Sequence, residues 1–414
     1  MQRRGGMDFE NDDLQQKRAA RQAIKKQKRK RRLIRLLVIA GVFVMTLATI
    51  LVVKGCRDLQ RKKKTTPENP KTVIRIAAAG DLNINDAVVA SGGDNYDYTA
   101  AFRDVLHLLG DADVTVVNLE GNIVGAPYGT ADRSAPKELL TALDKAGVDL
   151  VQLANSYSIY NGITGLTSTI NAVKAAGMEP LGAYATEKEY KNSGGYTMVE
   201  VQGVRVAFVA FTKGMDGMAL PRGSEECVNL LYKDYDSTYH SVDKARINKV
   251  LDAAERAKPD AIVVMLHWGS EFNDTISTSQ NEILELLQER EVDAIIGTHS
   301  HYVQQMVFDK EKGTFVAYSL GDLFSDAERS GTEYSVVLEL EITKDQVTGE
   351  TKVTNFAYTP IFSVAEEGKP MRVVRIQETM EAYEAKFINA VTDETYNKMK
   401  YALQRIESRI NGTG

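Results

Sequence analysis

Three of the five histidines of this chain lie in two short segments that each follow an apolar run. His267 follows Val-Val-Met-Leu, whereas His299 and His301 form a His-x-His pair after Ala-Ile-Ile-Gly-Thr. Alternate residues at the end of a β-strand point to the same side, and imidazole is a common ligand of transition metals. This spacing predicts a metal site at the ends of two strands.

Side chains that offer oxygen follow three other apolar runs. Asp81 comes directly after Gly80 at the end of the first run, Glu120 ends the second, and Asn155 follows the third. The carboxyl ends of parallel strands meet at one edge of a sheet, so we expect these groups near the histidines. A mixed oxygen and nitrogen set suits Mn²⁺, Fe or Zn²⁺, and a bridging carboxylate is typical of two-metal hydrolases. We therefore expect one or two divalent metal ions, while each residue alone also fits a turn or a hydrogen-bonded core position.

Apolar runs rich in β-branched residues alternate with amphipathic helical segments. The runs are continuous, which predicts strands buried on both faces, at 73–79, 114–119, 150–153, 204–211, 261–266, 294–296 and 314–319. Apolar residues have helical spacing at 98–109, 136–146, 165–176, 241–257 and 278–291. The alternation predicts a layered α/β domain over residues 72–365, which ends in a hairpin between 333 and 360. A helical extension is expected at 366–414.

Residues 36–53 form an uncharged apolar run whose length fits the lower end of a membrane span. Basic clusters flank this run, and the heavier one, at 25–32, predicts that the tail of residues 1–35 stays in the cytoplasm. We therefore expect a single-pass protein of the cell membrane, with a linker at 54–71 and an extracellular main domain. A cleaved signal peptide is the alternative, although no small-x-small site follows the run.

The net charge of the chain changes sign at the end of the predicted linker. Residues 1–71 carry 20 Lys and Arg against 6 Asp and Glu, a net charge of +14, whereas the remainder has 31 against 50, a net charge of −19. A basic tract next to an apolar span favours anionic headgroups over nucleic acid, and no nucleic-acid fold signature occurs elsewhere. The two cysteines, Cys56 and Cys227, exclude a disulfide framework but leave open a single bridge, or a lipid on Cys56.

Six short blocks occur in order along the chain: Ala79–Asp81, Asn118–Glu120, Ala154–Asn155, His267–Glu271, Gly297–His301 and Tyr318–Asp322. Together they resemble the CapA family of bacterial capsule and poly-γ-glutamate synthesis proteins, a branch of the calcineurin-like metallophosphoesterase superfamily. The resemblance implies a four-layer α-β-β-α sandwich, with these loops at one edge. It also implies two metal sites that share Glu120. One would use Asp81 and His301, and the other Asn155, His267 and His299.

The chain departs from this family most clearly in one loop, with smaller changes at Thr298, Ser300 and Asp322. Relatives carry a histidine and an aspartate where this chain has Tyr157 and Tyr160. In related phosphoesterases that histidine protonates the leaving oxygen, and tyrosine, with an unperturbed pKa of about 10, is a poorer proton donor. The catalytic candidates are therefore His267, His299 and Tyr157, and we expect hydrolysis to be slow or absent. Asp322 replaces an asparagine of relatives and either orients a ligating histidine or forms a turn.

Three functional hypotheses follow. The leading one is a membrane-anchored, metal-binding CapA-like protein that supports synthesis, export or attachment of an anionic cell-envelope polymer such as poly-γ-glutamate. The alternatives are a metal-dependent phosphoesterase or amide hydrolase, and a catalytically degenerate scaffold that holds membrane-embedded synthesis subunits. Charge bears on the first hypothesis, because a domain with a net charge of −19 repels a polyanion unless divalent ions or a basic patch offset its field.

Overall fold

The chain divides into two units, residues 1–68 and 69–414. The computed structural model describes the second unit except for residues 327–328, 388–390 and 414. The predicted cytoplasmic tail, the predicted transmembrane helix and most of the predicted linker at 54–71 therefore lie outside the described residues. Within the described part, no helix combines the length and the apolar character needed to cross a membrane.

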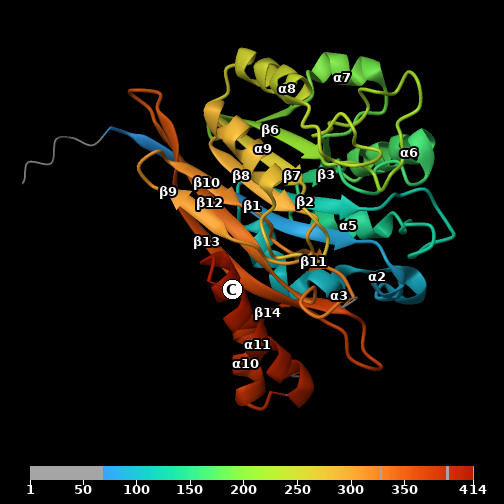
Figure 1. Ribbon diagram of the computed structural model, residues 1–414. Helices are drawn as coiled ribbons and strands as arrows, with labels where there is room; N and C mark the ends of the chain where they lie inside the picture. Colours follow the sequence, from blue (N-terminus) through green and yellow to red (C-terminus); the bar gives the residue numbers. More distant parts are fainter. Residues whose placement is uncertain (1–68, 327–328, 388–390, 414) are drawn as a thin grey trace, which may run out of the picture. The chain divides into compact units, whose positions relative to one another are not determined.

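The first sheet is mixed and has strand β1 at its centre (Figure 1). Its strand order is β14-β13-β12-β1-β2-β3-β4, and β11 pairs with the end of β1. The strands parallel to β1 (Lys71–Asn83) are β2 (Val114–Glu120), β3 (Leu150–Gln152), β4 (Glu179–Leu181) and β11 (Asp322–Phe324). The antiparallel part consists of β12 (Tyr334–Asp345), β13 (Thr351–Val364) and β14 (Arg372–Arg375). Strands β12 and β13 form the predicted hairpin.

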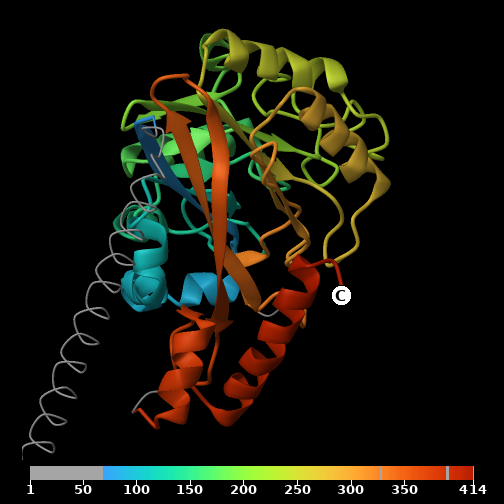
Figure 2. The same ribbon diagram turned by 90° about the vertical axis from the view of Figure 1, so that its left-hand side faces the viewer.

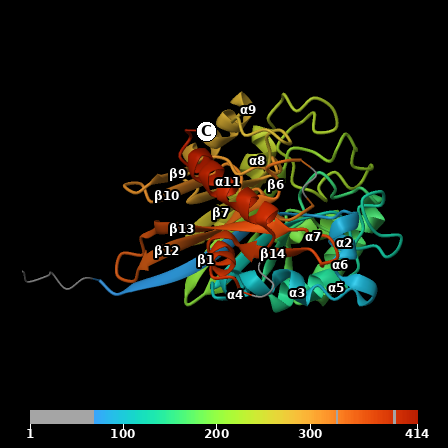
Figure 3. The same cartoon turned by 90° about the horizontal axis from the view of Figure 1, so that it is seen from below.

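The second sheet has the order β5-β6-β7-β8-β10-β9. Its four parallel strands are β6 (Val204–Thr212), β7 (Ala261–His267), β8 (Ala294–Thr298) and β10 (Thr314–Ala317). The antiparallel edges are β5 (Thr197–Val201) and β9 (Met306–Asp309). Seen from below, the two sheets lie in separate layers (Figure 3).

Strand β6 shows how the second sheet is buried on both faces. Alternate residues point to opposite faces of a strand, and here one set belongs to the core shared with the first sheet: Val206, Phe208 and Ala210. The other set packs under two helices: Ala207, Val209 and Phe211. These helices are α8 (Lys244–Arg256) and α9 (Thr278–Glu289), whose apolar sides bring Ile247, Leu251, Ile283 and Leu287 to the same core.

Helices also cover the outer face of the first sheet, which gives the α-β-β-α order of layers (Figure 3). Two of them are α5 (Glu138–Lys145) and α6 (Gly162–Ala175), which bury Leu139, Leu143 and Ile170. The shorter helices are α2 (Asp86–Ala90), α3 (Thr99–Phe102), α4 (Leu106–Gly110) and α7 (Glu187–Ser193), with 3₁₀ turns η1 (Gly93–Asn95) and η2 (Arg103–Val105). The prediction of an α/β fold is confirmed.

The single helix expected at 98–109 is wrong. The segment is instead divided into α3, η2 and α4. The backbone leaves helical geometry at Phe102, with φ −106° and ψ 0°, and again at Val105, with φ −114° and ψ 4°. Both side chains are fully buried, so core packing overrides the local helical pattern at these two positions.

The segment 366–414, expected as a helical extension, first adds β14 to the first sheet. Helices α10 (Ile376–Glu384) and α11 (Asp393–Ile410) follow, and both lie beside the lower end of β13 and β14 (Figures 1 and 2). Helix α11 buries Met399, Ala402 and Ile406 in the main core. The domain boundaries themselves stay a prediction.

An aspartate precedes each of four parallel strands, at the edge where these strands begin. In the first sheet, Asp113 and Asp149 accept hydrogen bonds of 2.7 and 2.8 Å from backbone N–H groups of β1 and β2. In the second sheet, Asp260 and Asp293 accept equivalent bonds from β6 and β7, both 2.8 Å long. Each carboxylate thus pairs with a backbone donor of the neighbouring strand.

Candidate metal centre

Two groups of buried acidic and histidine side chains lie at the opposite edge, where the parallel strands end, and both include Glu120. One group consists of Glu120, His267 and His299, and the other of Asp81, Glu120 and His301. Within each group, one ligand atom per residue lies within 4.8 Å of the others. Strands β1, β2 and β7 supply Asp81, Glu120 and His267, and the two other histidines follow β8. The topology therefore brings together five of the six predicted ligands.

His267 lies at the middle of the first group. Its Nε2 atom is 3.0 Å from Glu120 Oε1 and 3.1 Å from Ser156 Oγ, while its Nδ1 atom is 3.1 Å from Thr298 Oγ1. The contact with Glu120 lacks hydrogen-bond geometry, and both carboxylate oxygens of Glu120 are without a hydrogen-bond partner. The ring of His299 lies 4.4 Å from that of His267, centroid to centroid. These side chains therefore lie close together, but the oxygens of Glu120 remain without hydrogen-bond partners.

His301 faces three carboxylates in the second group. Its Nδ1 atom is 2.7 Å from Asp322 Oδ1 and 3.8 Å from Asp81 Oδ2, and its Nε2 atom is 3.8 Å from Glu120 Oε2. Burial lowers the pKa of His301, but Asp322 and Glu120 outweigh this effect and leave that pKa well above its usual range. Asp322 therefore holds the imidazole of His301 in place. This contact agrees with the first of its two predicted roles, that of orienting a histidine.

Two glycines allow the strands that carry these groups to meet closely. A Cβ atom on Gly80 would lie 1.7 Å from the carbonyl oxygen of Gly321, and one on Gly297 would lie 1.9 Å from that of Tyr318. Only glycine permits such backbone contacts. Asp81 can thus follow Gly80 directly and pair in register with Asp322 of β11.

The loop after β8 holds its two histidines in an uncommon backbone conformation. His299 has φ +89° and His301 has φ +58°, in the left-handed region that residues other than glycine rarely adopt. This conformation costs about 1–2 kcal/mol per residue. The His299 N–H group donates a 2.9 Å hydrogen bond to Asp81 Oδ2, which helps to hold the loop. Strain of this kind is typical of functional loops.

Several polar atoms of the centre are buried and have no hydrogen-bond partner. Asp81 is 0% and Glu120 1% exposed, and unpaired atoms include both oxygens of Glu120, Asp322 Oδ2 and His299 Nε2. Burial raises the pKa of both Asp81 and Glu120 to about 7 and lowers that of His267 to about 3. Metal ions bind carboxylates and neutral imidazoles, so the donor set fits a divalent cation.

Asn155, the sixth predicted ligand, is engaged with its neighbours. Its Nδ2 atom donates hydrogen bonds to Leu119 O at 2.6 Å and to Asn118 Oδ1 at 3.1 Å. Its Oδ1 atom accepts a 3.0 Å bond from the backbone N–H of Tyr157. The Asn155 amide therefore ties its loop to the end of β2, whereas the hydroxyl of Ser156 lies beside the histidines.

The hydroxyl of Tyr157, a predicted catalytic residue, accepts a hydrogen bond from a basic side chain. Arg133 Nη2 donates a 2.9 Å hydrogen bond to Tyr157 Oη, and the guanidinium lies 4.1 Å above the centre of the tyrosine ring. The other end of the guanidinium donates to Asn83 Oδ1 at 2.9 Å. Burial raises the pKa of Tyr157 above its usual value, so the phenol keeps its proton at neutral pH. Tyr160 packs edge-on against this ring.

Sequence reasoning missed several neighbours of the centre. Asn118 donates a 2.6 Å hydrogen bond to Asp81 Oδ1, and its place in the same block as Glu120 was a usable signal. Lys213, directly after β6, donates to a backbone carbonyl in the loop after β7 at 3.0 Å, and burial lowers its pKa. Lys213 and Arg133 lie in loops where no motif marks them.

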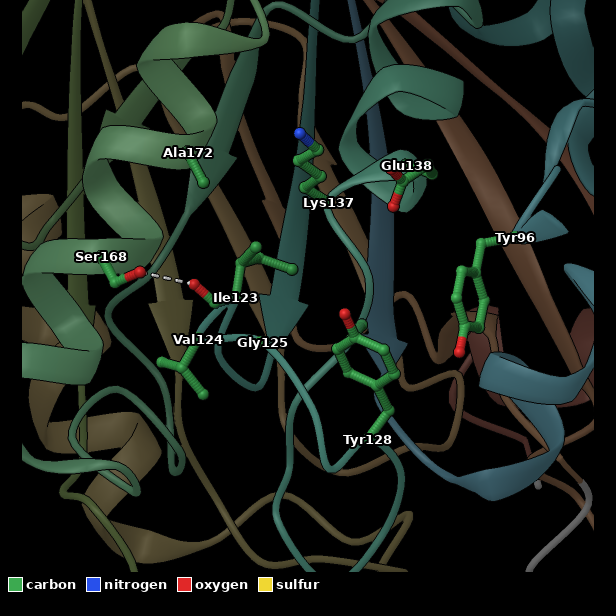
Figure 4. Close-up of a pocket in the computed structure, with 10 residues that line it drawn as sticks. Tyr96, Ile123, Val124, Gly125, Tyr128, Lys137, Glu138, Ser168 and Ala172 are labelled. Carbon is green, nitrogen blue, oxygen red and sulfur yellow. Dashed lines mark hydrogen bonds between the residues drawn. The ribbon is translucent and has the colours of Figure 1, made fainter. Parts of the chain in front are cut away.

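A separate pocket of about 380 Å³ is lined by the segment that follows β2, by residues of α5 and α6, and by Tyr96 (Figure 4). Tyr96 and Tyr128 contribute to its lining, and their rings meet edge to face with centroids 5.4 Å apart. Val124 and Lys137 also line it. This pocket contains none of the predicted site residues.

A family model described as "Bacterial capsule synthesis protein PGA_cap" matches residues 75–327. The chain belongs to this family. The capsule biosynthesis protein CapA of Bacillus anthracis is 27% identical over 316 residues, which cover 73% of this chain and 72% of that protein. The PGA biosynthesis protein CapA of Bacillus subtilis is 23% identical over 219 residues, 53% of either chain. A probable polyglutamine synthesis accessory protein of Mycobacterium tuberculosis is 26% identical over 236 residues, 56% of this chain and 60% of that one. The predicted CapA membership is confirmed.

Solved structures show weaker similarity to this PGA_cap protein. The calcineurin-like phosphoesterase YfkN of Bacillus subtilis is 16% identical, with a TM-score of 0.45 over 81% of this chain and all of the other. A phosphatase of Mycoplasma pneumoniae is 14% identical, with a TM-score of 0.44 over 71% of this chain and 95% of the other. Similarity at this level carries no conclusion about activity.

Proposed function

We propose that this protein is a membrane-anchored, metal-binding member of the PGA_cap family that supports synthesis, export or attachment of an anionic cell-envelope polymer such as poly-γ-glutamate. Family membership and the names of the matched capsule proteins support the polymer. The observation that carries the metal-binding part is the buried donor set around Glu120, whose two carboxylate oxygens have no hydrogen-bond partner.

Mn, Fe or Zn ions suit this donor set of imidazole nitrogens and carboxylate oxygens. Glu120 would be shared between two ions, with Asp81 and His301 on one side and His267 and His299 on the other. Bound ions of this kind neutralise an anionic ligand or lower the pKa of a bound water molecule.

Neighbouring side chains would orient the ligating imidazoles. Asp322 holds Nδ1 of His301 at 2.7 Å, and Thr298 lies 3.1 Å from Nδ1 of His267. Such contacts fix the ring orientation and leave Nε2 of either histidine toward Glu120. The chain thus supplies a preformed arrangement, in which little reorganisation accompanies ion binding.

Positive charge near the centre would reduce the repulsion between the acidic domain and a polyanion. Burial raises the pKa of Glu120, and the positive charges of His301 and Arg133 oppose this effect, so the charge of Arg133 acts on the centre. Lys213 similarly contributes to the lowered pKa values of His267 and His299, in which burial is the larger cause. With bound ions, these two cations would form a local positive region in a domain of net charge −19.

The proposal places the protein in the cell membrane as a single-pass chain with its N-terminus in the cytoplasm. The apolar run at 36–53 and the basic cluster before it support this topology. The domain that begins at β1 would then act outside, next to the polymer and to membrane-embedded synthesis subunits.

Complementation of a producer strain that lacks its own CapA protein tests the proposal. The full-length chain should restore cell-surface polymer, whereas Glu120→Gln should reduce it at least about tenfold at equal amounts of membrane protein. Glu339→Gln, at a partly exposed position on β12, is the matched control and should behave as wild type. Full restoration by Glu120→Gln would contradict the proposed role of the metal.

Hydrolysis of a phosphoester or amide bond is the second candidate function. The proximity of Arg133 to Tyr157, 2.9 Å between Nη2 and Oη, favours it, because a cation and a protonated phenol beside the centre suit an anionic group of a substrate. Turnover of bis-p-nitrophenyl phosphate by the Mn²⁺-loaded full-length chain, lost in His299→Ala, would support hydrolysis. No turnover would favour a scaffold that has lost catalysis.

A further inference from the structure

We infer that Ser156, rather than Asn155, is the oxygen ligand that completes the metal group of Glu120, His267 and His299. This inference rests on the proposed metal-binding function, because it assigns one ligand of the ion that this function requires. The CapA resemblance points to Asn155 at this position, but the geometry of the loop after β3 points to its neighbour.

The position of the Ser156 hydroxyl carries the assignment. Its Oγ atom lies 3.1 Å from Nε2 of His267 and 3.5 Å from Nδ1 of His299. Ligands about 2.1 Å from an ion in tetrahedral geometry are about 3.4 Å apart, so these separations match neighbouring ligands of one ion. Glu120 Oε1, at 3.0 Å from the same Nε2 atom, fits as a further ligand. Ser156 is only 5% exposed, and its hydroxyl therefore faces the centre and not solvent.

The loop keeps Asn155 out of the same position. Both ends of its amide are used, by Leu119, Asn118 and the backbone of Tyr157. Ser158 Oγ accepts a 2.9 Å hydrogen bond from the backbone N–H of Asn155, which fixes the turn. Turning the Asn155 oxygen toward an ion would break these bonds and leave buried polar groups without hydrogen-bond partners.

A thiol placed at either position reports directly on ligation. A cysteine that binds a metal ion is deprotonated, and a Co²⁺–thiolate bond absorbs in the near ultraviolet. The full-length chain with Ser156→Cys should therefore develop this band when it is titrated with Co²⁺. Wild type, which retains Cys56 and Cys227, supplies the background, and Asn155→Cys is the matched control that should develop no additional band.

Ser156→Ala supplies an independent measurement. This change removes one oxygen and no charge, so it should weaken one bound Co²⁺ at least about tenfold in equilibrium dialysis. The metal-free chain should melt within about 3 °C of wild type, because removal of a hydroxyl creates little space.

The outcomes separate this ligand assignment from the proposed function. A band with Asn155→Cys and none with Ser156→Cys would overturn the assignment, as would unchanged Co²⁺ affinity in Ser156→Ala. Wild type that binds no Co²⁺ by dialysis would overturn the metal-binding function, and the assignment with it. Uptake by wild type together with the Ser156→Cys band supports both.

Discussion

The two edges of the same parallel strands place carboxylates in opposite environments. Where the strands begin, Asp113 and Asp149 accept hydrogen bonds from backbone N–H groups of neighbouring strands. Where the strands end, Asp81 and Glu120 are fully buried, and both oxygens of Glu120 lack a hydrogen-bond partner. The comparison shows that backbone donors pair with the acids at one edge, whereas Glu120 at the other edge has no such donor. The proposed metal ion would supply the missing partner.

Glu120→Gln should produce the largest effect of the proposed variants. It tests most directly whether the acids at the two edges differ in their need for a cation. Loss of the shared carboxylate should weaken Mn²⁺ binding at least about 100-fold, measured by calorimetric titration of the full-length chain. The same change should raise the metal-free free energy of unfolding at pH 8, by up to about 3 kcal/mol, because burial raises the pKa of Glu120 to about 7. Reduced metal-free stability would show that Glu120 is satisfied without an ion.

Asp322→Asn should have the next largest effect on the metal. The 2.7 Å contact between Asp322 and His301 keeps one imidazole oriented, so its weakening should lower Mn²⁺ affinity about 10- to 100-fold. Calorimetric titration measures this change. A Mn²⁺ affinity equal to that of wild type would show that Asp322 does not orient a ligand and would favour the alternative that it is a turn residue.

Asp149→Ala tests the edge where the strands begin. Loss of its 2.8 Å bond leaves the Thr115 N–H unpaired and should lower the free energy of unfolding by about 1–3 kcal/mol in urea denaturation. Asp149→Asn retains an acceptor and should lose less. Mn²⁺ affinity should stay unchanged in both variants, and a loss of affinity would remove the distinction between the edges.

Asp293→Asn should have an effect on stability of similar size, and one that depends on pH. Burial raises the pKa of Asp293 from its ordinary value of 3.8 to about 6, so the folded chain binds this proton more tightly than the unfolded chain does. Wild type should therefore lose stability relative to the variant as pH rises from about 4 to about 6, reaching a difference of about 1–3 kcal/mol. Unfolding measured at pH 4.5 and pH 8 checks this, and an equal difference at both pH values would contradict it.

Much of the candidate centre was predictable because parallel strands end at a common edge. Asp81, Glu120 and His267 each follow a continuous apolar run, so their strand ends could be aligned without knowledge of tertiary contacts. The His299 and His301 pair follows the same rule, although its positive φ angles have no signal in the local sequence.

The loop after β3 shows what sequence could not determine. Asn155 and Ser156 are adjacent, and which of them faces the histidines depends on the hydrogen bonds of one turn. Arg133 reaches Tyr157 across 24 positions, a contact that no local pattern encodes. By contrast, an aspartate directly before each of four apolar runs is visible in the sequence and was a missed signal for the opposite edge.

Metal content tests the central claim most directly. We predict that the full-length chain, purified without chelator, contains one or two equivalents of Mn, Fe or Zn by elemental analysis, and that the Glu120→Gln variant contains less than about a tenth of this amount. Wild type that remains metal-free after exposure to these ions, with no change in its melting temperature, would contradict the account.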